Sequence, residues 1–278
     1  MEKKCRLCNS KNIKLIKNGV RDNKNIDVFK CLNCGLEFLS NTQQADEKYY
    51  EQGQMHSSYN LNNWLKNTLA DDKRRAYFLR KYIKNKDILD FGTGNGGFLI
   101  QAKKYAKSVS GCDLDKSLNE HYKKNNLEVK NSLKEFNEKF DIITMFHVLE
   151  HIENPEPIIT SIKEHLKPNG KLIIEIPNSE DALLTLYKSE AFKNFTYWSC
   201  HLYAYNSMNL QRLLKPIVKV NKIIHIQRYP YTNHIGWLTD KKAGGHKRYP
   251  TNKILNYVYT IFLKLTKKTD TLLVIASC

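Results

Sequence analysis

Two histidines and a glutamate stand close together in the string HVLEH, residues 147–151. Written as H-x-x-E-H, this pattern supplies two zinc ligands and a general base from one helix in a class of metal-dependent hydrolases. Here the string follows a strand-like run, KFDIITMF, and the segment NPEP begins three positions after its last histidine, so no long helix is available. The residue types therefore indicate acid-base chemistry at the end of a strand rather than a metal centre.

Four cysteines form two C-x-x-C pairs, CRLC at 5–8 and CLNC at 31–34, separated by a spacer of hairpin size. This spacing predicts a zinc ribbon, in which the metal replaces a hydrophobic core too small to fold alone. The predicted ligands are Cys5, Cys8, Cys31 and Cys34. Four thiolates leave no open coordination position, so we expect a structural ion; iron in a rubredoxin-like site is the alternative.

Short strand-like and helix-like runs alternate from Asp87 onward. The runs ILDF, SVSGCDL, DIITMF and KLIIEIP read as strands, and amphipathic segments lie between them. This alternation predicts a parallel, doubly wound α/β sheet. We expect a zinc ribbon at 1–40, a helical connector at 41–85 that packs on the next domain and contributes to the cover of its site, and the α/β domain at 86–278 with a loop-rich insert at 227–250.

A glycine-rich turn, ILDFGTGNGGFL, joins the first of these strands to a helix. Gly92, Gly94 and Gly97 satisfy the dinucleotide pattern G-x-G-x-x-G, which would indicate an NAD enzyme. The carboxylate of Asp90, however, would repel a pyrophosphate and would suit a ligand that carries an ammonium and a sulfonium group. The glycines also run with Gly96 as D-x-G-x-G-x-G.

With these motifs the chain resembles class I S-adenosylmethionine-dependent methyltransferases, from about Ile83 to the C-terminus. The resemblance implies a Rossmann-like, seven-stranded sheet with S-adenosylmethionine as cofactor. It implies that the glycine loop wraps the methionine part, that Asp113 binds the ribose hydroxyls, and that Asn131 and Ser132 stand where a carboxylate usually lies near the adenine. The residues so assigned are Asp90, Gly92, Thr93, Gly94, Gly96, Asp113, Leu114, Asn131, Ser132, Phe146 and His147.

A narrower resemblance, to methyltransferases that act on sugars, comes from the cysteine ribbon, Tyr49-Tyr50 and the strings VLEHI, EIPN and CHLYAYN. It implies that Glu150 and His151 face the methyl group and that His201 lies close to the acceptor. Either imidazole is a suitable base for a sugar hydroxyl, because its pKa lies near neutrality. The sequence leaves open which of the two histidines is the base.

Aromatic and basic residues elsewhere are candidates for acceptor binding. The insert at 227–250 reads as an acceptor lid, since aromatic faces suit sugar rings and basic groups suit phosphate; an ordinary surface or oligomer contact is the alternative. The candidate acceptor contacts are Tyr49, Tyr50, Tyr59, His234, Trp237 and His246.

The composition limits the classes of partner that the protein could bind. The chain has 278 residues, 41% hydrophobic and 11% aromatic, which is typical of a folded protein. Without an apolar run of about 20 residues or an apolar N-terminal segment, we expect a cytoplasmic location and no membrane insertion. The net charge of +17 would suit an anionic partner. The excess is nearly all Lys, however, and Asn is abundant too, as A-rich codons alone would produce.

The sequence therefore predicts an O-methyltransferase for a sugar, a nucleotide-sugar or a precursor of a surface or capsule polysaccharide. A phosphate-like oxygen, an amine or a carbon as the methylated atom stays open, as does the oligomeric state. The alternative is an RNA methyltransferase that grips nucleic acid with the ribbon and its basic surface. A non-enzymatic scaffold is a third reading.

Overall fold

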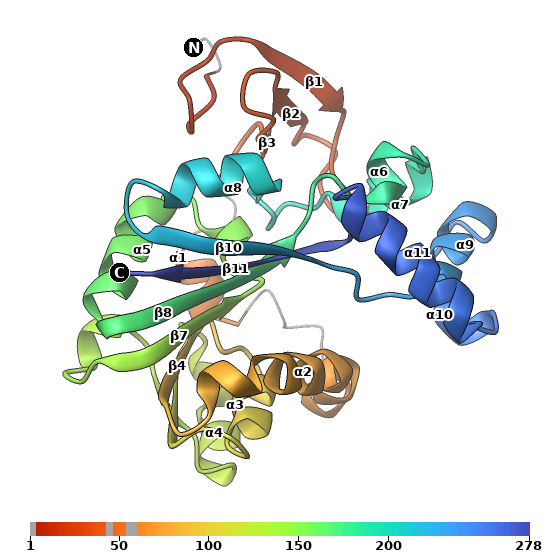
Figure 1. The fold of residues 1–278 in the computed structure, drawn as a ribbon. Coiled ribbons are helices and arrows are strands. Elements are labelled where there is room, and N and C mark those ends of the chain that lie inside the picture. The colour runs from red at the N-terminus through yellow and green to blue at the C-terminus, as the bar shows by residue number, and fades with distance from the viewer. Residues whose placement is uncertain (1–3, 43–46, 54–59) are drawn as a thin grey trace. The chain divides into compact units, whose positions relative to one another are not determined.

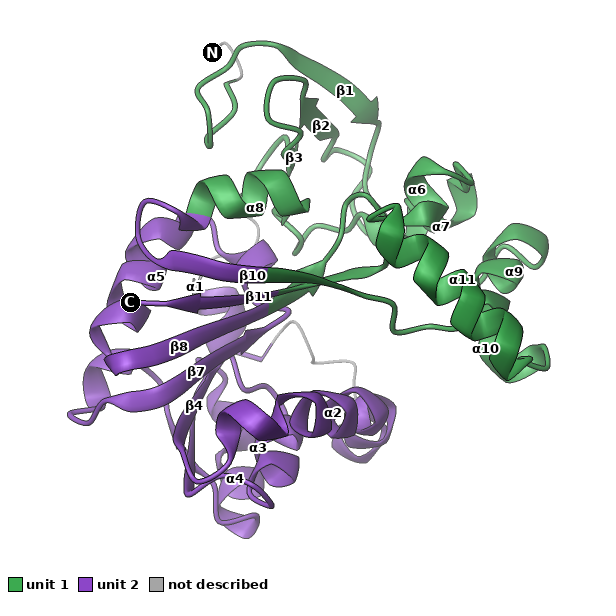
Figure 2. Cartoon of the chain, viewed as in Figure 1, with its two compact units in different colours: residues 1–42, 175–213, 223–273 green, residues 43–174, 214–222, 274–278 purple. Residues whose placement is uncertain are grey.

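The computed structural model describes residues 4–42, 47–53 and 60–278. Contacts group the chain into two compact units, coloured separately in Figure 2. Unit 1 consists of residues 1–42, 175–213 and 223–273, and unit 2 of residues 43–174, 214–222 and 274–278. The domain boundaries expected near residues 40 and 85 remain predictions. The contacts place the cysteine-bearing segment in one unit with much of the last third of the chain.

A seven-stranded sheet has the order β10-β11-β8-β7-β4-β5-β6 (Figure 1). The strands are β4 (Asp87–Phe91), β5 (Ser108–Cys112), β6 (Glu128–Lys130), β7 (Phe140–Phe146), β8 (Leu166–Pro177), β10 (Lys219–Ile226) and β11 (Thr271–Ser277). Strand β4 pairs in parallel with both β5 and β7, and β5 pairs in parallel with β6. The chain winds outward in both directions from β4, so the doubly wound α/β fold predicted from the sequence is confirmed.

In unit 2, helices flank the strands that carry the glycine loop. They are α1 (Glu47–Glu51), α2 (Leu61–Ile83), α3 (Gly97–Ala102), α4 (Asn119–Lys124) and α5 (Pro155–Glu164), with short 3-10 helices η2 (Lys116–Leu118), η3 (Leu133–Glu135) and η4 (Leu149–His151). The side chain of Asn60 caps α2 by accepting hydrogen bonds from the backbone N–H groups of Asn62 and Asn63. Leu79 and Ile83 are buried along α2, which packs against α3.

In unit 1, the cysteine-bearing segment builds a small antiparallel sheet from β1 (Ile13–Lys17), β2 (Val28–Cys31) and β3 (Glu37–Leu39). Its fourth strand, β9 (Tyr203–Ala204), comes from the CHLYAYN string and pairs antiparallel with β3. A distant segment therefore completes the ribbon. Val28, Leu36 and Leu39 are buried within it, so a small apolar core accompanies the thiols.

Unit 1 also contains the helices of the last third of the chain and the ends of β8, β10 and β11. Its helices are α6 (Ala182–Thr185), α7 (Glu190–Thr196), α8 (Ser207–Leu214, whose last residue belongs to unit 2), α9 (Tyr231–Thr239), α10 (Gly245–Arg248) and α11 (Lys253–Leu265). The insert expected to be loop-rich holds α9 and α10. Both are short, and they approach so closely that a Cβ added at Gly245 would lie 2.2 Å from the carbonyl oxygen of Thr232. A glycine that serves close packing reads in a sequence like a glycine that serves a turn.

Candidate functional site

The glycine loop follows β4 at the carboxyl edge of the sheet. Gly92 has φ +72°, and a Cβ there would lie 2.3 Å from Cγ2 of Val148, so only glycine fits. Gly94 has φ +52°, donates from its N–H to the carboxylate of Asp113 at 2.7 Å, and accepts at its carbonyl from the hydroxyl of Tyr122 at 2.5 Å. These contacts fix the loop at the N-terminus of α3.

Asp90 lies at the end of β4, directly before the loop. Its side chain is buried, and its Oδ1 accepts a hydrogen bond of 2.6 Å from the hydroxyl of Thr144 on β7. Burial raises the pKa of Asp90 to about 7, against the lowering effects of Thr144 and of the Arg75 guanidinium. A cationic group bound beside this carboxyl would stabilise its ionised form. The position thus suits an ammonium-bearing ligand.

Asp113 follows β5 and is partly exposed. Its Oδ2 accepts from the N–H of Gly94, and its Oδ1 accepts from the N–H of Asp115 at 3.0 Å. Burial raises the pKa of Asp113, and these two backbone hydrogen bonds lower it. Each carboxylate oxygen has a further lone pair, so the group retains the capacity to accept hydrogen bonds from two ribose hydroxyls.

The predicted adenine-side residues hold the strand ends together. The amide of Asn131 donates to the carbonyl of Asp113 at 2.9 Å, and the hydroxyl of Ser132 accepts from the N–H of Lys134 at 3.3 Å, which caps η3. Leu114 lies partly exposed between the two acids of the β5 turn. The contact of these residues with an adenine stays a prediction.

Side chains of α2 reach the glycine loop and the neighbouring end of β7, although the sequence assigned this helix mainly to packing. The Trp64 ring lies 3.3 Å from where a Cβ of Gly94 would be. The guanidinium of Arg75 lies 4.8 Å from the ring centre of Phe146, which itself meets Phe98 edge-on at 4.7 Å. Asp72 and Arg75 are both buried, with 3.6 Å between carboxylate and guanidinium, on the same helical face as Leu79. Charged residues on a face that also carries apolar residues are the signal that could have identified Arg75.

The HVLEH string forms the end of β7, a turn and the 3-10 helix η4. His147 has φ +55°, a left-handed conformation that a non-glycine residue rarely adopts, and such strain is common at functional sites. Its Nδ1 lies 3.3 Å from Oε1 of the buried Glu150. A single 3-10 turn does not place both histidines on one helical face.

His151 is buried and lies against α1. The hydroxyl of Tyr50 is 3.4 Å from Nδ1 of His151, and the two rings meet nearly at right angles with centres 6.1 Å apart. The Tyr49 ring lies 5.4 Å from that of Tyr50. The structure thus brings Tyr49, Tyr50 and His151 together, as a base with an orienting hydroxyl would require. Tyr59 lies outside the described residues.

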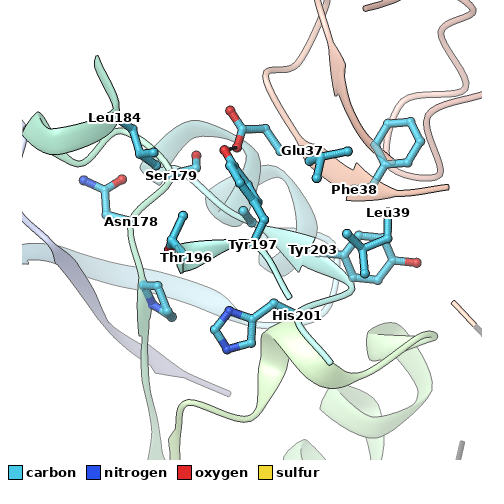
Figure 3. A pocket seen from close by; sticks show the side chains of 13 residues that line it. Glu37, Phe38, Leu39, Asn178, Ser179, Leu184, Thr196, Tyr197, His201 and Tyr203 are labelled. Carbon is cyan, nitrogen blue, oxygen red and sulfur yellow. Dashed lines mark hydrogen bonds between the residues drawn. The ribbon is translucent and has the colours of Figure 1, made fainter. Parts of the chain in front are cut away.

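His201 belongs to unit 1 and lines a partly open pocket there. Figure 3 shows the hydroxyl of Tyr197 directed at the carboxylate of Glu37, with a hydrogen bond of 2.6 Å. Nζ of Lys30 lies 3.1 Å from the other oxygen of Glu37. Burial raises the pKa of Glu37, whereas Lys30 and Tyr197 lower it.

Ser179 adds an unsatisfied polar group to this pocket. It is 4% exposed, and its Oγ has no hydrogen-bond partner among the described residues. The sequence analysis did not identify Glu37, Tyr197 or Ser179. Glu37 and Tyr197 stand 160 positions apart in the chain, so no local pattern joins them. The EIPN string, which ends directly before Ser179, was the one local signal.

The acceptor candidates of the insert have partners within unit 1. His234 is buried, burial lowers its pKa to about 4, and its Nδ1 lies 2.6 Å from the Tyr259 hydroxyl. Trp237 is buried with its ring centre 5.2 Å and 5.0 Å from those of Phe192 and Phe195. His246 is half-buried, with Nδ1 3.4 Å from the Asn233 side chain. Acceptor binding by these residues stays a prediction, and packing accounts for the first two.

The four predicted metal ligands lie together. Their sulfur atoms are all within 4.8 Å of one another, with 3.5 Å between Cys5 and Cys34 and 3.5 Å between Cys8 and Cys31. Asn9 and Gly35, each directly after a C-x-x-C pair, have positive φ and turn the chain around the cluster. Four clustered thiols are the donor set of a structural zinc site, so these residues fit the ion.

The family model for a methyltransferase domain matches residues 55–216. The chain belongs to the methyltransferase domain family. The ubiquinone biosynthesis O-methyltransferase of Coxiella burnetii is 30% identical over 135 residues, 44% of this chain and 57% of that protein. That of Glaesserella parasuis is 35% identical over 133 residues, 42% of this chain and 54% of that protein. The chain thus spans little more than half the length of these curated relatives.

Solved structures agree on the methyltransferase fold. A SAM-dependent methyltransferase from Archaeoglobus fulgidus aligns with a TM-score of 0.51 at 19% identity, covering 74% of this chain and 92% of that one. A chain from the complex of the Haloferax volcanii Trm112 methyltransferase activator aligns with a TM-score of 0.53 at 12% identity, covering 83% and 96%. The resemblance to class I methyltransferases is thereby confirmed for family and fold.

Proposed function

We propose that this protein transfers the methyl group of S-adenosylmethionine to an oxygen of a small acceptor. The observation that carries the proposal is the arrangement of Asp90, the glycine loop and Asp113 at the carboxyl edge of the sheet. The names of the relatives support an oxygen as the methylated atom.

The residues fit the cofactor. The buried carboxyl of Asp90 would hold the ammonium group, and the lone pairs of Asp113 would accept the ribose hydroxyls. When bound, S-adenosylmethionine supplies an electrophilic methyl group on a sulfonium. The protein's part is then to orient the acceptor oxygen and to remove its proton.

His151 and His201 are the candidate bases. Tyr50 supports His151 because its hydroxyl, 3.4 Å from Nδ1, holds the ring in one orientation. His201 is supported by its place on a pocket with polar and aromatic walls. Glu150 is 3.3 Å from His147 and would keep that imidazole oriented beside the cofactor.

For the acceptor we propose a sugar, a nucleotide-sugar or a surface-polysaccharide precursor, with a phosphate-like oxygen as a variant. The pocket of His201 supports this class because Ser179 offers an unsatisfied hydroxyl and Tyr197 and Tyr203 offer aromatic faces. The relatives' names give intermediates of ubiquinone biosynthesis as a second class. RNA is a third class, which steep salt dependence of RNA binding would support.

The cofactor part of the proposal is tested by titration calorimetry with S-adenosylmethionine. Asp90→Asn removes a charged partner of the ligand, so affinity should fall by about tenfold to 100-fold. Asp71→Asn, a partly exposed carboxyl of α2 paired with Arg74, is the matched control and should bind as the unchanged protein does. Equal affinity of Asp90→Asn and the unchanged protein would contradict the assignment.

The base is identified with His151→Ala and His201→Ala, assayed on sugar nucleotides and on intermediates of ubiquinone biosynthesis. Loss of the true base should lower kcat by about 100-fold or more and flatten the rise of kcat with pH, because no imidazole then titrates. The other variant should keep the pH profile. An unchanged rate in the double variant would eliminate both histidines.

A further inference from the structure

Helix α11 turns an apolar face to solvent. Its exposed large side chains are Ile254 (76%), Leu255 (59%), Tyr257 (68%), Val258 (59%), Ile261 (39%), Phe262 (46%) and Leu265 (79%). These positions recur with helical spacing, so they form one stripe along the whole helix. We call these seven side chains the α11 stripe. Leu263 is the one buried residue on this helix.

The outward orientation of the stripe is held by polar anchors on other positions of the helix. The side chain of Asn256 accepts a hydrogen bond of 3.0 Å from the N–H of Tyr231. The hydroxyl of Tyr259 lies 2.6 Å from Nδ1 of His234 and 2.9 Å from the hydroxyl of Tyr187. Figure 1 shows α11 beside α9, from which Tyr231 and His234 come. The helix thus presents its apolar residues outward through specific contacts.

The chain around the stripe, between Asp240 and Asp270, is rich in basic residues. Residues 241–269 contain eight Lys and Arg residues and no Asp or Glu. Six of these basic residues are exposed lysines, namely Lys241, Lys242, Lys247, Lys253, Lys264 and Lys267. An apolar stripe with lysines at its ends is complementary to a surface that is anionic outside and apolar beneath.

We propose that α11 binds the surface of an anionic lipid bilayer. The α11 stripe enters the boundary between headgroups and acyl chains, and the flanking lysines contact lipid phosphates. In the described part of the chain, no helix is long and apolar enough to cross a membrane. The 13 residues of α11 span about 20 Å, short of a bilayer core of about 30 Å, so the helix lies along the surface.

A second copy of the chain is a poorer occupant of the stripe. A two-fold contact through α11 would place the same basic residues of both copies against one another, because such an interface is self-complementary. Like charges facing each other oppose association. An anionic bilayer satisfies the stripe and the lysines together.

The test is co-flotation of the full chain with vesicles of phosphatidylcholine, with and without phosphatidylglycerol. We expect binding to the anionic vesicles that weakens as salt is raised, since the lysine contacts are screened. Ile254→Ser with Leu265→Ser should lower the bound fraction by about tenfold, because two of the most exposed stripe residues no longer enter the bilayer. Lys253→Glu with Lys264→Glu should do the same through charge.

The matched controls lie elsewhere on the surface. Leu32→Ser removes an exposed leucine of the cysteine segment, and Lys123→Glu changes an exposed lysine of α4; both should leave flotation unchanged. S-adenosylmethionine binding by every variant, measured calorimetrically, separates this proposal from the proposed activity. Failure of the unchanged protein to float with anionic vesicles would overturn the proposal. So would light scattering that shows a dimer dissociated by the two serine substitutions, which would assign the stripe to a second copy.

Discussion

Two buried carboxyl groups, Asp90 in unit 2 and Glu37 in unit 1, differ in how the protein balances their charge. Burial raises the pKa of both. Glu37 has an ammonium group, Lys30, at 3.1 Å and a phenol, Tyr197, at 2.6 Å. Asp90 has a hydroxyl at 2.6 Å and the more distant charge of Arg75. A buried carboxylate whose charge is balanced by protein groups stabilises the fold. A buried carboxylate whose ionised form would be stabilised by an added cation is suited to binding a cationic ligand.

The units also differ in what stabilises them. Unit 2 contains the parallel strands β4 to β7, which bury apolar side chains such as Ile142, Ile143 and Met145. The cysteine segment of unit 1 has a smaller core and four clustered thiols. We therefore expect unit 1 to depend on metal and on ion pairs, and unit 2 to depend on its core.

The largest effect should come from the metal ligands. Cys5→Ser with Cys34→Ser should abolish zinc binding and destabilise the ribbon by about 5 kcal/mol or more, since the free energy of zinc binding is also free energy of folding. Elemental analysis and hydrogen exchange of β1 to β3 measure this, with exchange of β4 to β7 unchanged. Cys278→Ser, at an exposed lone cysteine, is the control. Equal zinc content in the double variant would mean that the cluster is not the metal site.

A smaller effect should follow from Glu37→Gln, which keeps the shape of the side chain and removes its charge. Loss of the Lys30 ion pair and weakening of the Tyr197 hydrogen bond should cost about 1–3 kcal/mol of unfolding free energy. Denaturant unfolding measures the loss, and S-adenosylmethionine affinity should not change. If the variant instead lost cofactor affinity at full stability, the contrast between Glu37 and Asp90 would fail.

The smallest effect concerns pH. Because the pKa of Asp90 is raised to about 7, its carboxyl is partly protonated at neutral pH, and a bound cation must expel that proton. As pH is raised toward 7, affinity for S-adenosylmethionine should therefore increase about tenfold per pH unit, and above pH 7 it should level off. Without ligand the sign for stability is opposite: the raised pKa favours the fold below about pH 4, and this contribution is lost as pH rises through 7. Calorimetry in buffers of different ionisation enthalpy detects the released proton, and Asp90→Asn should show neither trend.

Several parts of the site were predictable from short stretches of sequence. The glycine loop with Asp90, the acid after the second strand and the C-x-x-C pairs are local patterns whose chemistry depends on neighbours a few positions away. In the structure, Asp113 accepts a hydrogen bond from the N–H of Gly94 in the loop, and the four thiols lie within 4.8 Å of one another. The parallel, doubly wound sheet followed from the alternation of strand-like and helix-like runs.

Other features were beyond reach of the sequence. Strand β9 joins the ribbon from more than 160 residues away, and the same separation hides the contact between Tyr197 and Glu37. The insert at 227–250 was expected to be loop-rich because its glycines suggest turns. In the structure, Gly236 and Gly245 instead allow α9 and α10 to pack closely. The outward orientation of the α11 stripe was not predictable, since periodicity does not say which way an apolar face points.

The sequence by itself predicted the pairs of cysteines, the glycine loop and the alternating sheet, because each follows from backbone geometry and side-chain chemistry within one or two adjacent elements. Only the tertiary structure decided that Glu37 is balanced within the protein, that Tyr50 meets His151, and that α11 faces outward. Such contacts join segments far apart in the chain, and many pairings compete for each side chain at similar cost in chain entropy. The choice among them is made by the packing of the whole unit.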